Sequence, residues 1–176
     1  GAFAAVRRAF SDPKVEWVIG NMNFLFEASG TKLHDQSPVV THEALVRNPD
    51  IVRQQPTFFR RQLLERAGGW DARFHMTMDY DLWTRLARIA TPLMIEDYLA
   101  CFRYHEDQKT SRRNVLTQSR ELAEIMLREG ARPEDIRKMR RQKQVLVTKL
   151  QIKSFLVRIG LLPDRFLSQP LRVRRT

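Results

Sequence analysis

Apolar side chains recur every three to four residues along much of the chain, and this spacing predicts amphipathic helices. In residues 80–90 the large apolar residues follow it: Leu82, Trp83, Leu86 and Ile89. Further helices are expected over 1–12, 42–47, 112–129 and 133–160, with a short one before Gly68-Gly69. Pro133 suits a first helical turn, and the two adjacent glycines suit a left-handed helix end.

Shorter apolar runs bounded by turn residues predict strands between these helices. Residues 15–35 are expected to form two strands joined at Ser29-Gly30. Residues 92–105 are expected to form two short strands hinged at Glu96-Asp97. The fold class is therefore α/β. Cys101, the only cysteine, lies inside the second apolar run, so we expect a buried structural thiol and no intramolecular disulfide.

Composition and charge narrow the class of protein. The 176 residues are 43% hydrophobic, which fits one domain or one domain with an extension. The chain has no run of about eighteen apolar residues, so no transmembrane helix is predicted. The first ten residues contain two arginines and do not resemble a signal peptide. The net charge is +11, and residues 137–176 hold twelve of the 31 Lys and Arg residues beside a single acid, Asp164. Such a basic segment favours anionic partners.

Two aspartates in "MTMDYDLW" are the first candidates for chemistry. Asp79 and Asp81 bracket a tyrosine at the start of the predicted helix 80–90. A carboxylate there can cap the helix by accepting backbone N–H bonds, and Asp79 held in that way can also act as a base toward a hydroxyl. As a bare pattern, D-x-D also occurs in metal sites. The residues alone leave these interpretations open.

The stretch "FRYHEDQKTSRR" ends a predicted strand with a histidine and several cations. His105 is followed by Lys109, Arg112 and Arg113. Side chains of these kinds can contact a phosphate group or a divalent metal. An exposed loop histidine is the open alternative.

The stretch "RQQPTFF" places polar side chains before two phenylalanines. Gln54, Gln55 and Thr57 either form a wall suited to a sugar or another polyol, or belong to a solvated loop beside packed aromatic residues. The chain lacks the motifs of dinucleotide sites, P-loops, α/β-hydrolase serines and zinc clusters.

The order of "QQPTFFRRQLLERAGGWD", "MDYDLWTRLAR" and "FRYHEDQKTSRR" resembles the C-terminal half of inverting family-2 glycosyltransferases of the GT-A fold. The resemblance covers about residues 1–113. It implies a partial GT-A fold, Rossmann-like with short strands. The pattern and charge of residues 114–176, outside the resemblance, predict a basic helical extension. In this family the nucleotide-binding half and its metal-binding D-x-D precede such a segment. We therefore expect the chain to be the acceptor-side part of a longer domain and Asp79-Asp81 not to be the metal motif.

The resemblance also implies roles for single residues. Asp79 matches the catalytic base, and Met78 stands where a glutamate is common. Asp81 supports the helix start, and Trp83 packs near the acceptor or in the core. The residues that match the remaining acceptor side are Gln55, Pro56 and Thr57.

The donor-side roles fall on the segment after the last predicted strand. His105 matches the position that meets the metal or the diphosphate. Lys109 and Arg112 match the loop that closes over the donor. The implied cofactor is Mg²⁺ or Mn²⁺, expected only in the full-length enzyme.

The predicted helix from Pro133 carries two apolar faces. One face holds Ile136, Met139, Leu146, Val147, Leu150 and Val157. The other holds Val145, Ile152, Phe155, Leu156 and Ile159. One face can pack on the body, and the second needs a partner, for which the alternatives are a membrane surface contacted through 133–176 or a second copy of the chain. Nucleic acid is not expected, because few aromatic residues lie among the cations.

The expected function is transfer of a sugar from a nucleotide-sugar donor to the hydroxyl of a sugar or lipid-linked acceptor, with inversion, in cell-surface polysaccharide or glycolipid synthesis. We expect this chain alone to be inactive, because the donor-binding half is not part of it. The expected location is the cytoplasm, at the inner face of the membrane. The alternative is a non-catalytic module that binds a membrane surface or a partner through its basic tail.

Overall fold

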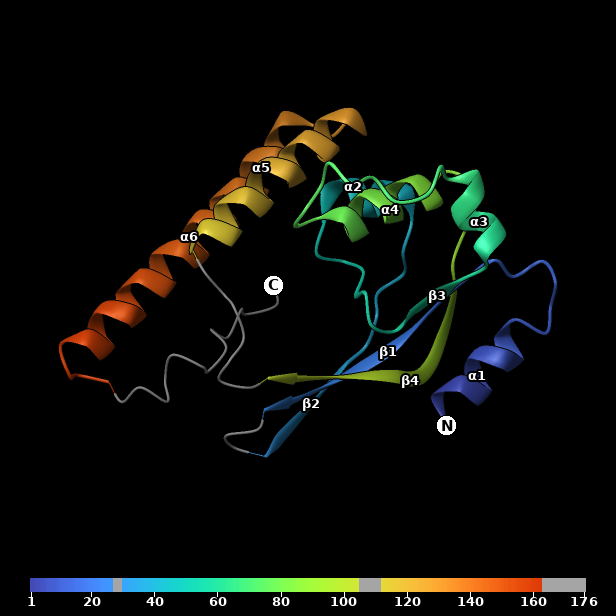
Figure 1. Cartoon of the computed structure of the whole chain (residues 1–176), viewed down its shortest axis with the longest axis horizontal. Coiled ribbons are helices and arrows are strands. Elements are labelled where there is room, and N and C mark those ends of the chain that lie inside the picture. The colour runs from blue at the N-terminus through green and yellow to red at the C-terminus, as the bar shows by residue number, and fades with distance from the viewer. Residues whose placement is uncertain (27–29, 105–111, 163–176) are drawn as a thin grey trace.

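The computed structural model describes residues 1–26, 30–104 and 112–162 (Figure 1). Its elements in chain order are α1 (Ala2–Ala9), β1 (Trp17–Phe26), β2 (Thr31–Asp35), α2 (His42–Arg47), β3 (Thr57–Phe59), α3 (Arg61–Arg66), α4 (Met78–Leu86), β4 (Leu93–Tyr104), α5 (Arg112–Arg128) and α6 (Pro133–Arg158). This part of the chain is mixed α/β, as the sequence predicts. Every predicted helix is present. Strand β3 was not predicted from the sequence, because three residues are too few to show an alternating pattern.

Strand β1 is the centre of a four-stranded mixed sheet. β4 runs parallel to it along one edge, and β2 and β3 run antiparallel to it along the other. β2 pairs with residues 22–26 of β1 and β3 with residues 17–19, so the two lie at opposite ends of that edge. Parallel neighbours require a crossover, and α2, α3 and α4 lie in the connection between β1 and β4 (Figure 1).

β4 is one continuous strand of twelve residues, so the predicted hinge at Glu96-Asp97 is wrong. Its pairing with β1 shifts register between Ile19 and Met22. The chain bulges there without breaking, and Asn21 Nδ2 donates a 2.8 Å hydrogen bond to the carbonyl of Glu96.

Cys101 is exposed, so the expectation of a buried thiol is also wrong. Successive side chains of a strand point to opposite faces. Ala100 and Phe102 share one face of β4 and are half-buried. Cys101 and Arg103 lie on the other face and are exposed. An apolar run in the sequence therefore does not show which of its members reach solvent.

A hydrophobic core joins the sheet to the helices. Its members come from β1, α2, α3, α4, α5 and α6, and include Trp17, Ile19, Leu45, Leu63, Leu82, Leu86, Leu122, Ile125, Met126, Ile136 and Met139. Ile125 and Met126 are fully buried, and burial of such side chains contributes about 1.5–3 kcal/mol each. The segment predicted as an extension from residue 114 thus shares its first half with the core of residues 1–104.

Helix α6 presents two different faces, as its pattern predicts. Ile136, Met139 and Val147 are buried, whereas Val145, Ile152, Phe155 and Ile159 are exposed. Figure 1 shows α6 beside α5, with the C-terminal half of α6 extending past the start of α5. Across the described ranges, no helix has the length and apolar character needed to cross a membrane.

The close approach of β4 to Gly20 yields a stability prediction. A Cβ at this position would lie 2.4 Å from Leu99 Cγ and 2.8 Å from the carbonyl oxygen of Asp97. We therefore expect Gly20→Ala to lower the free energy of unfolding by about 1–3 kcal/mol, measured by urea denaturation. The Gly20→Ala/Leu99→Ala double variant should lose less than the sum of the two single losses. Additive losses would show that Leu99 does not cause the clash.

Candidate functional site

A pocket of about 460 Å³ lies at the start of α4 and is the candidate site. Its described lining residues are Gln54, Trp70, His75, Met76, Met78 and Asp79. They come from the loop before β3, the connection from α3 to α4, and the first turn of α4. This volume is within the range of small-molecule sites in proteins.

Asp79 is the only carboxylate among these lining residues. The expectation that it caps a helix beginning at Tyr80 is wrong, because α4 begins at Met78 and Thr77 is the N-cap. Asp79 Oδ1 instead accepts a 2.8 Å hydrogen bond from the backbone N–H of Tyr80. Burial raises the pKa of Asp79, although backbone hydrogen bonds act in the opposite direction. A raised pKa makes the carboxylate a stronger base than a solvated aspartate.

Glu121 of α5 holds the segment that leads into α4. Its carboxylate accepts hydrogen bonds from the backbone N–H of His75 at 3.1 Å and of Met76 at 2.8 Å, and from the hydroxyl of Thr77 at 2.9 Å. A negative charge at the start of a helix is also favourable toward the helix dipole. The carboxylate at the head of α4 thus comes from a residue more than forty positions away.

Asp81 is a structural residue of α4. Its side chain is 0% exposed and pairs with two arginines. Arg85 Nη2 lies 2.6 Å from Oδ2, and Arg128 Nη1 of α5 lies 2.6 Å from Oδ1. A buried carboxylate needs such partners, because an unpaired charge in the interior is strongly destabilising. Asp81 therefore fastens α4 to α5 two residues after Asp79.

A second buried carboxylate, Glu129, extends this network. It accepts hydrogen bonds from His42 of α2 and from Arg128, each at 2.9 Å, and pairs with Arg88 at 2.9 Å. Burial acts to raise the pKa of Glu129, but these hydrogen bonds and charges outweigh it and hold the pKa below 4.5. The stabilisation is present above that ordinary value and is lost as pH falls through the lowered pKa.

Arg85 also fixes the far wall of the pocket. Its Nη1 donates to the carbonyl of Ala67, the residue at the C-terminal end of α3. Gly68 and Gly69 follow with φ of 83° and 74°, a left-handed conformation that glycine adopts without strain. The next residue is Trp70, so the guanidinium of Arg85 links α4, which carries Asp79, to the segment that carries Trp70.

The structure separates the residues that the resemblance assigns to the acceptor side. Met78 and Asp79 line the pocket, whereas Gln55, Pro56, Thr57 and Trp83 do not. Pro56 is buried, and its carbonyl accepts a hydrogen bond from the N–H of Gly20. The hydroxyl of Thr57 donates to the carbonyl of Arg53 at 2.6 Å. The neighbouring Gln54 lines the pocket instead.

Trp83 is 2% exposed and belongs to the core, which is one of its two expected positions. Its ring stacks on Trp17 of β1 at 5.9 Å between ring centroids, with an angle of 19° between the planes. Phe59 of β3 packs against it edge-on at 5.8 Å. Trp83 thus joins α4 to the sheet.

The expected donor-side residues are not placed by the structure. His105 and Lys109 lie outside the described residues, and so does the side chain of Arg112, the first residue of α5. Within the described ranges, no group of three or more His, Cys, Asp or Glu side chains could hold a metal ion. The implied Mg²⁺ or Mn²⁺ is expected only in the full-length enzyme, so the metal role of His105 stays a prediction.

Sequence patterns missed four residues of the site. Trp70, His75 and Met76 line the pocket, and Glu121 holds the backbone N–H groups of residues 75–76. Trp70 follows the double glycine, which is a local indication of an aromatic held at a helix end. Glu121 has no comparable indication, because its partners are distant in sequence.

No model of a known protein family matches the chain, and a comparison with curated proteins finds no similar protein.

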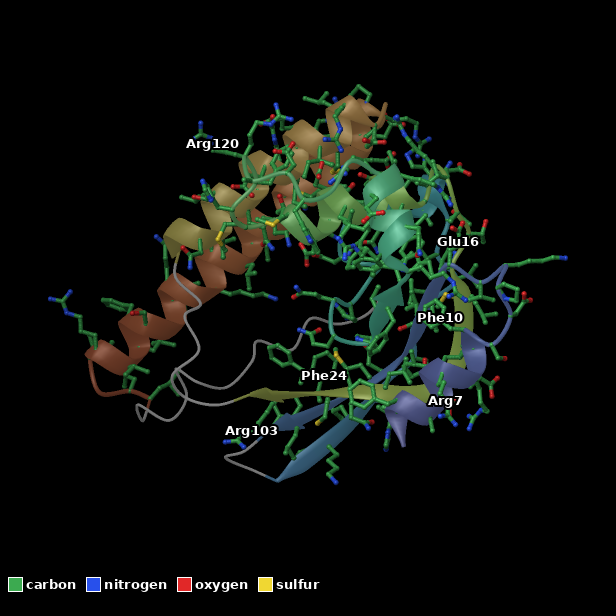
Figure 2. All side chains as sticks on the ribbon, turned by 45° about the vertical axis from the view of Figure 1, so that its right-hand side comes forward. Arg7, Phe10, Glu16, Phe24, Arg103 and Arg120 are labelled. Carbon is green, nitrogen blue, oxygen red and sulfur yellow. The ribbon has the colours of Figure 1, made fainter. Side chains whose placement is uncertain are left out.

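The pairing of Asp81 predicts a large effect of one arginine. Arg128→Gln leaves both Asp81 and Glu129 buried with one cation fewer, so we expect a loss of about 3 kcal/mol in the free energy of unfolding. The matched control is Arg120→Gln on the same helix, whose side chain is exposed and points away from the body (Figure 2). Urea denaturation measures the free energy of unfolding of both variants. Equal values for the two would contradict the predicted role of Arg128.

Proposed function

We propose that this chain is the acceptor-side part of an inverting family-2 glycosyltransferase of the GT-A fold. The observation that carries the proposal is Asp79, a carboxylate in the first turn of α4, at the wall of a pocket and with a raised pKa. The order of the surrounding motifs supports it, since Asp79 stands where the family has its base. The mixed α/β architecture is compatible with part of a GT-A domain.

In this proposal Asp79 takes the proton of the acceptor hydroxyl. The Tyr80 N–H holds Oδ1, so the second carboxylate oxygen receives the proton. The hydroxyl oxygen attacks the anomeric carbon of the nucleotide-sugar, and the bond from that carbon to the diphosphate oxygen breaks. The diphosphate leaves with the electron pair. One displacement of this kind inverts the configuration at the anomeric carbon.

The support of Asp79 suits this role. Catalytic groups need fixed positions, and the helix that carries Asp79 is tied to α5 through Asp81 and through the three hydrogen bonds of Glu121. Asp79 lines the pocket, where a substrate can reach it, and its burial raises its affinity for a proton.

Asp79→Asn tests the base directly. In the protein encoded by the complete native reading frame, we expect this change to lower sugar transfer by about 10²–10⁴-fold, because an amide cannot accept the proton. The thermal midpoint should stay close to that of the parent, and Glu124→Gln, at an exposed residue of α5, is the control. Turnover near the parent value in Asp79→Asn would refute the assignment.

The pH dependence of kcat/KM in the same protein is an independent test of Asp79 as the base. Because burial raises the pKa of Asp79, the acid limb of kcat/KM should lie above the ordinary aspartate value of 3.8. The rate should fall as the pH drops through that limb, since the protonated carboxyl cannot act as a base. An acid limb at or below 3.8 would contradict a role for this carboxylate.

The reading frame ahead of residue 1 distinguishes an enzyme from a non-catalytic module. A strand that ends in D-x-D there supports the glycosyltransferase. Its absence from the native gene would favour the module.

The C-terminal half of α6 favours a second candidate function, binding to an anionic membrane surface. Val145, Ile152, Phe155 and Ile159 are exposed along one side of this half. Lys149 and Arg158 are also exposed, and residues 137–176 carry twelve cations and one acid. Apolar side chains flanked by cations fit the interface of a bilayer that contains acidic lipids, where each well-placed cation contributes about 1 kcal/mol.

Vesicle sedimentation tests this surface. We expect the chain to bind vesicles containing phosphatidylglycerol, to bind less as salt is raised, and to bind phosphatidylcholine vesicles weakly. Ile152→Ser/Phe155→Ser should weaken binding by at least about tenfold, because it removes two apolar side chains from the interface. Val39→Ser, at an exposed apolar residue elsewhere, is the control.

Two results would overturn the membrane assignment. One is equal binding to both kinds of vesicle, or to neither. The other is a concentration-dependent dimer that the same double variant disrupts, which would assign this face to a second copy of the chain.

A further inference from the structure

Trp70 differs from the other two tryptophans of the chain. Trp17 and Trp83 are 0% and 2% exposed, whereas Trp70 is 47% exposed and lines the pocket beside Asp79. A large aromatic side chain left open to solvent in a pocket offers surface to a ligand.

The position of Trp70 is fixed by its neighbours. The N–H of Gly69 donates to the carbonyl of Leu64 at 3.0 Å, which closes the end of α3. The ring of Phe59 contacts Trp70 at 6.5 Å between centroids, at an angle of 60°. The indole is therefore held against β3 on one side, and its exposed part faces a pocket.

The polar groups around Trp70 indicate the chemistry of the ligand. Gln54 offers an amide that both donates and accepts, His75 offers an imidazole, and Asp79 offers a carboxylate. No Lys or Arg is among the lining residues that the structure describes. A phosphate or a nucleotide is therefore disfavoured at this wall, and a neutral ligand rich in hydroxyl groups is favoured.

A pyranose ring matches this arrangement. One face of such a ring carries C–H groups that pack on an aromatic plane, and its hydroxyl groups project from the rim toward hydrogen-bonding partners. The exposed Met76 and the half-buried Met78 add apolar surface beside the ring.

We propose that Trp70 is the stacking platform for the terminal pyranose of the acceptor, with Gln54 and His75 binding its hydroxyl groups and one hydroxyl presented to Asp79. That the sugar is an acceptor rests on the proposed function. That a sugar binds here rests on the pocket itself and is tested without catalysis.

The first experiment titrates the chain with methyl pyranosides of different configuration and follows the three indole N–H resonances by NMR. We expect at least one pyranoside to shift the Trp70 resonance, with the resonances of the buried Trp17 and Trp83 unmoved. Sorbitol, an acyclic polyol, and inorganic phosphate serve as controls and should leave Trp70 unchanged. If no pyranoside shifts Trp70, or if phosphate shifts it equally, the platform is refuted.

Variants separate stacking from a general effect on the fold. Trp70→Ala should weaken pyranoside binding by about tenfold, and Trp70→Phe should restore part of it, because a smaller aromatic ring keeps the stacking surface. Phe3→Ala, at an exposed aromatic residue of α1, is the matched control and should bind as the parent does. Binding by Trp70→Ala equal to that of the parent would overturn the proposal.

Turnover distinguishes this proposal from the proposed function. In the protein from the complete reading frame, Trp70→Ala should raise the KM for the acceptor by about tenfold, with a smaller change in kcat. If Asp79→Asn abolishes transfer but no pyranoside shifts the Trp70 resonance, the proposed function is supported and the stacking role of Trp70 is wrong. If pyranosides bind Trp70 but Asp79→Asn transfers normally, the sugar site stands and the base assignment is wrong.

Discussion

The buried carboxylate of Asp81 is the constraint on which the candidate site depends. A charge without solvent must keep its partners, and leaving it unpaired costs several kcal/mol. Arg85 and Arg128 satisfy it from the same helix and from α5. Because Arg85 also holds the end of α3, the pairing joins three helices around one pocket. The geometry of Asp79, two residues earlier, follows from this pairing.

Helix α5 supports the site from the segment that the sequence presents as an extension. Glu121 and Arg128 are seven residues apart, so they lie on the same face of α5, two turns from each other. Glu121 accepts hydrogen bonds from the backbone N–H groups of residues 75–76, and Arg128 donates one to Asp81. Ile125 lies between them and is fully buried. The same face thus supplies the polar supports and part of the core.

Local sequence patterns predicted the helices and strands of this chain better than they predicted the contacts between them. The periodicity of "HEALVR" gave α2 to the residue, and Gly130 and Pro133 marked the α5–α6 turn, because each depends on neighbours in sequence. The continuity of β4 and the partners of Glu121 depend on elements far along the chain. The order of the motifs pointed to Asp79, whereas the place of Trp70 in the pocket and the hydrogen bonds of Glu121 are seen only in the folded structure.

The segment between α3 and α4 is anchored at both ends. Arg85 holds the carbonyl of Ala67, and Glu121 holds the backbone N–H groups of His75 and Met76. The exposed pocket-lining side chains of this span, Trp70, His75 and Met76, can therefore be exchanged while the helix that bears Asp79 keeps its place. An engineer who wants to change which ligand the pocket binds has a short span, fixed at both ends, to vary, and Asp79 need not be replaced.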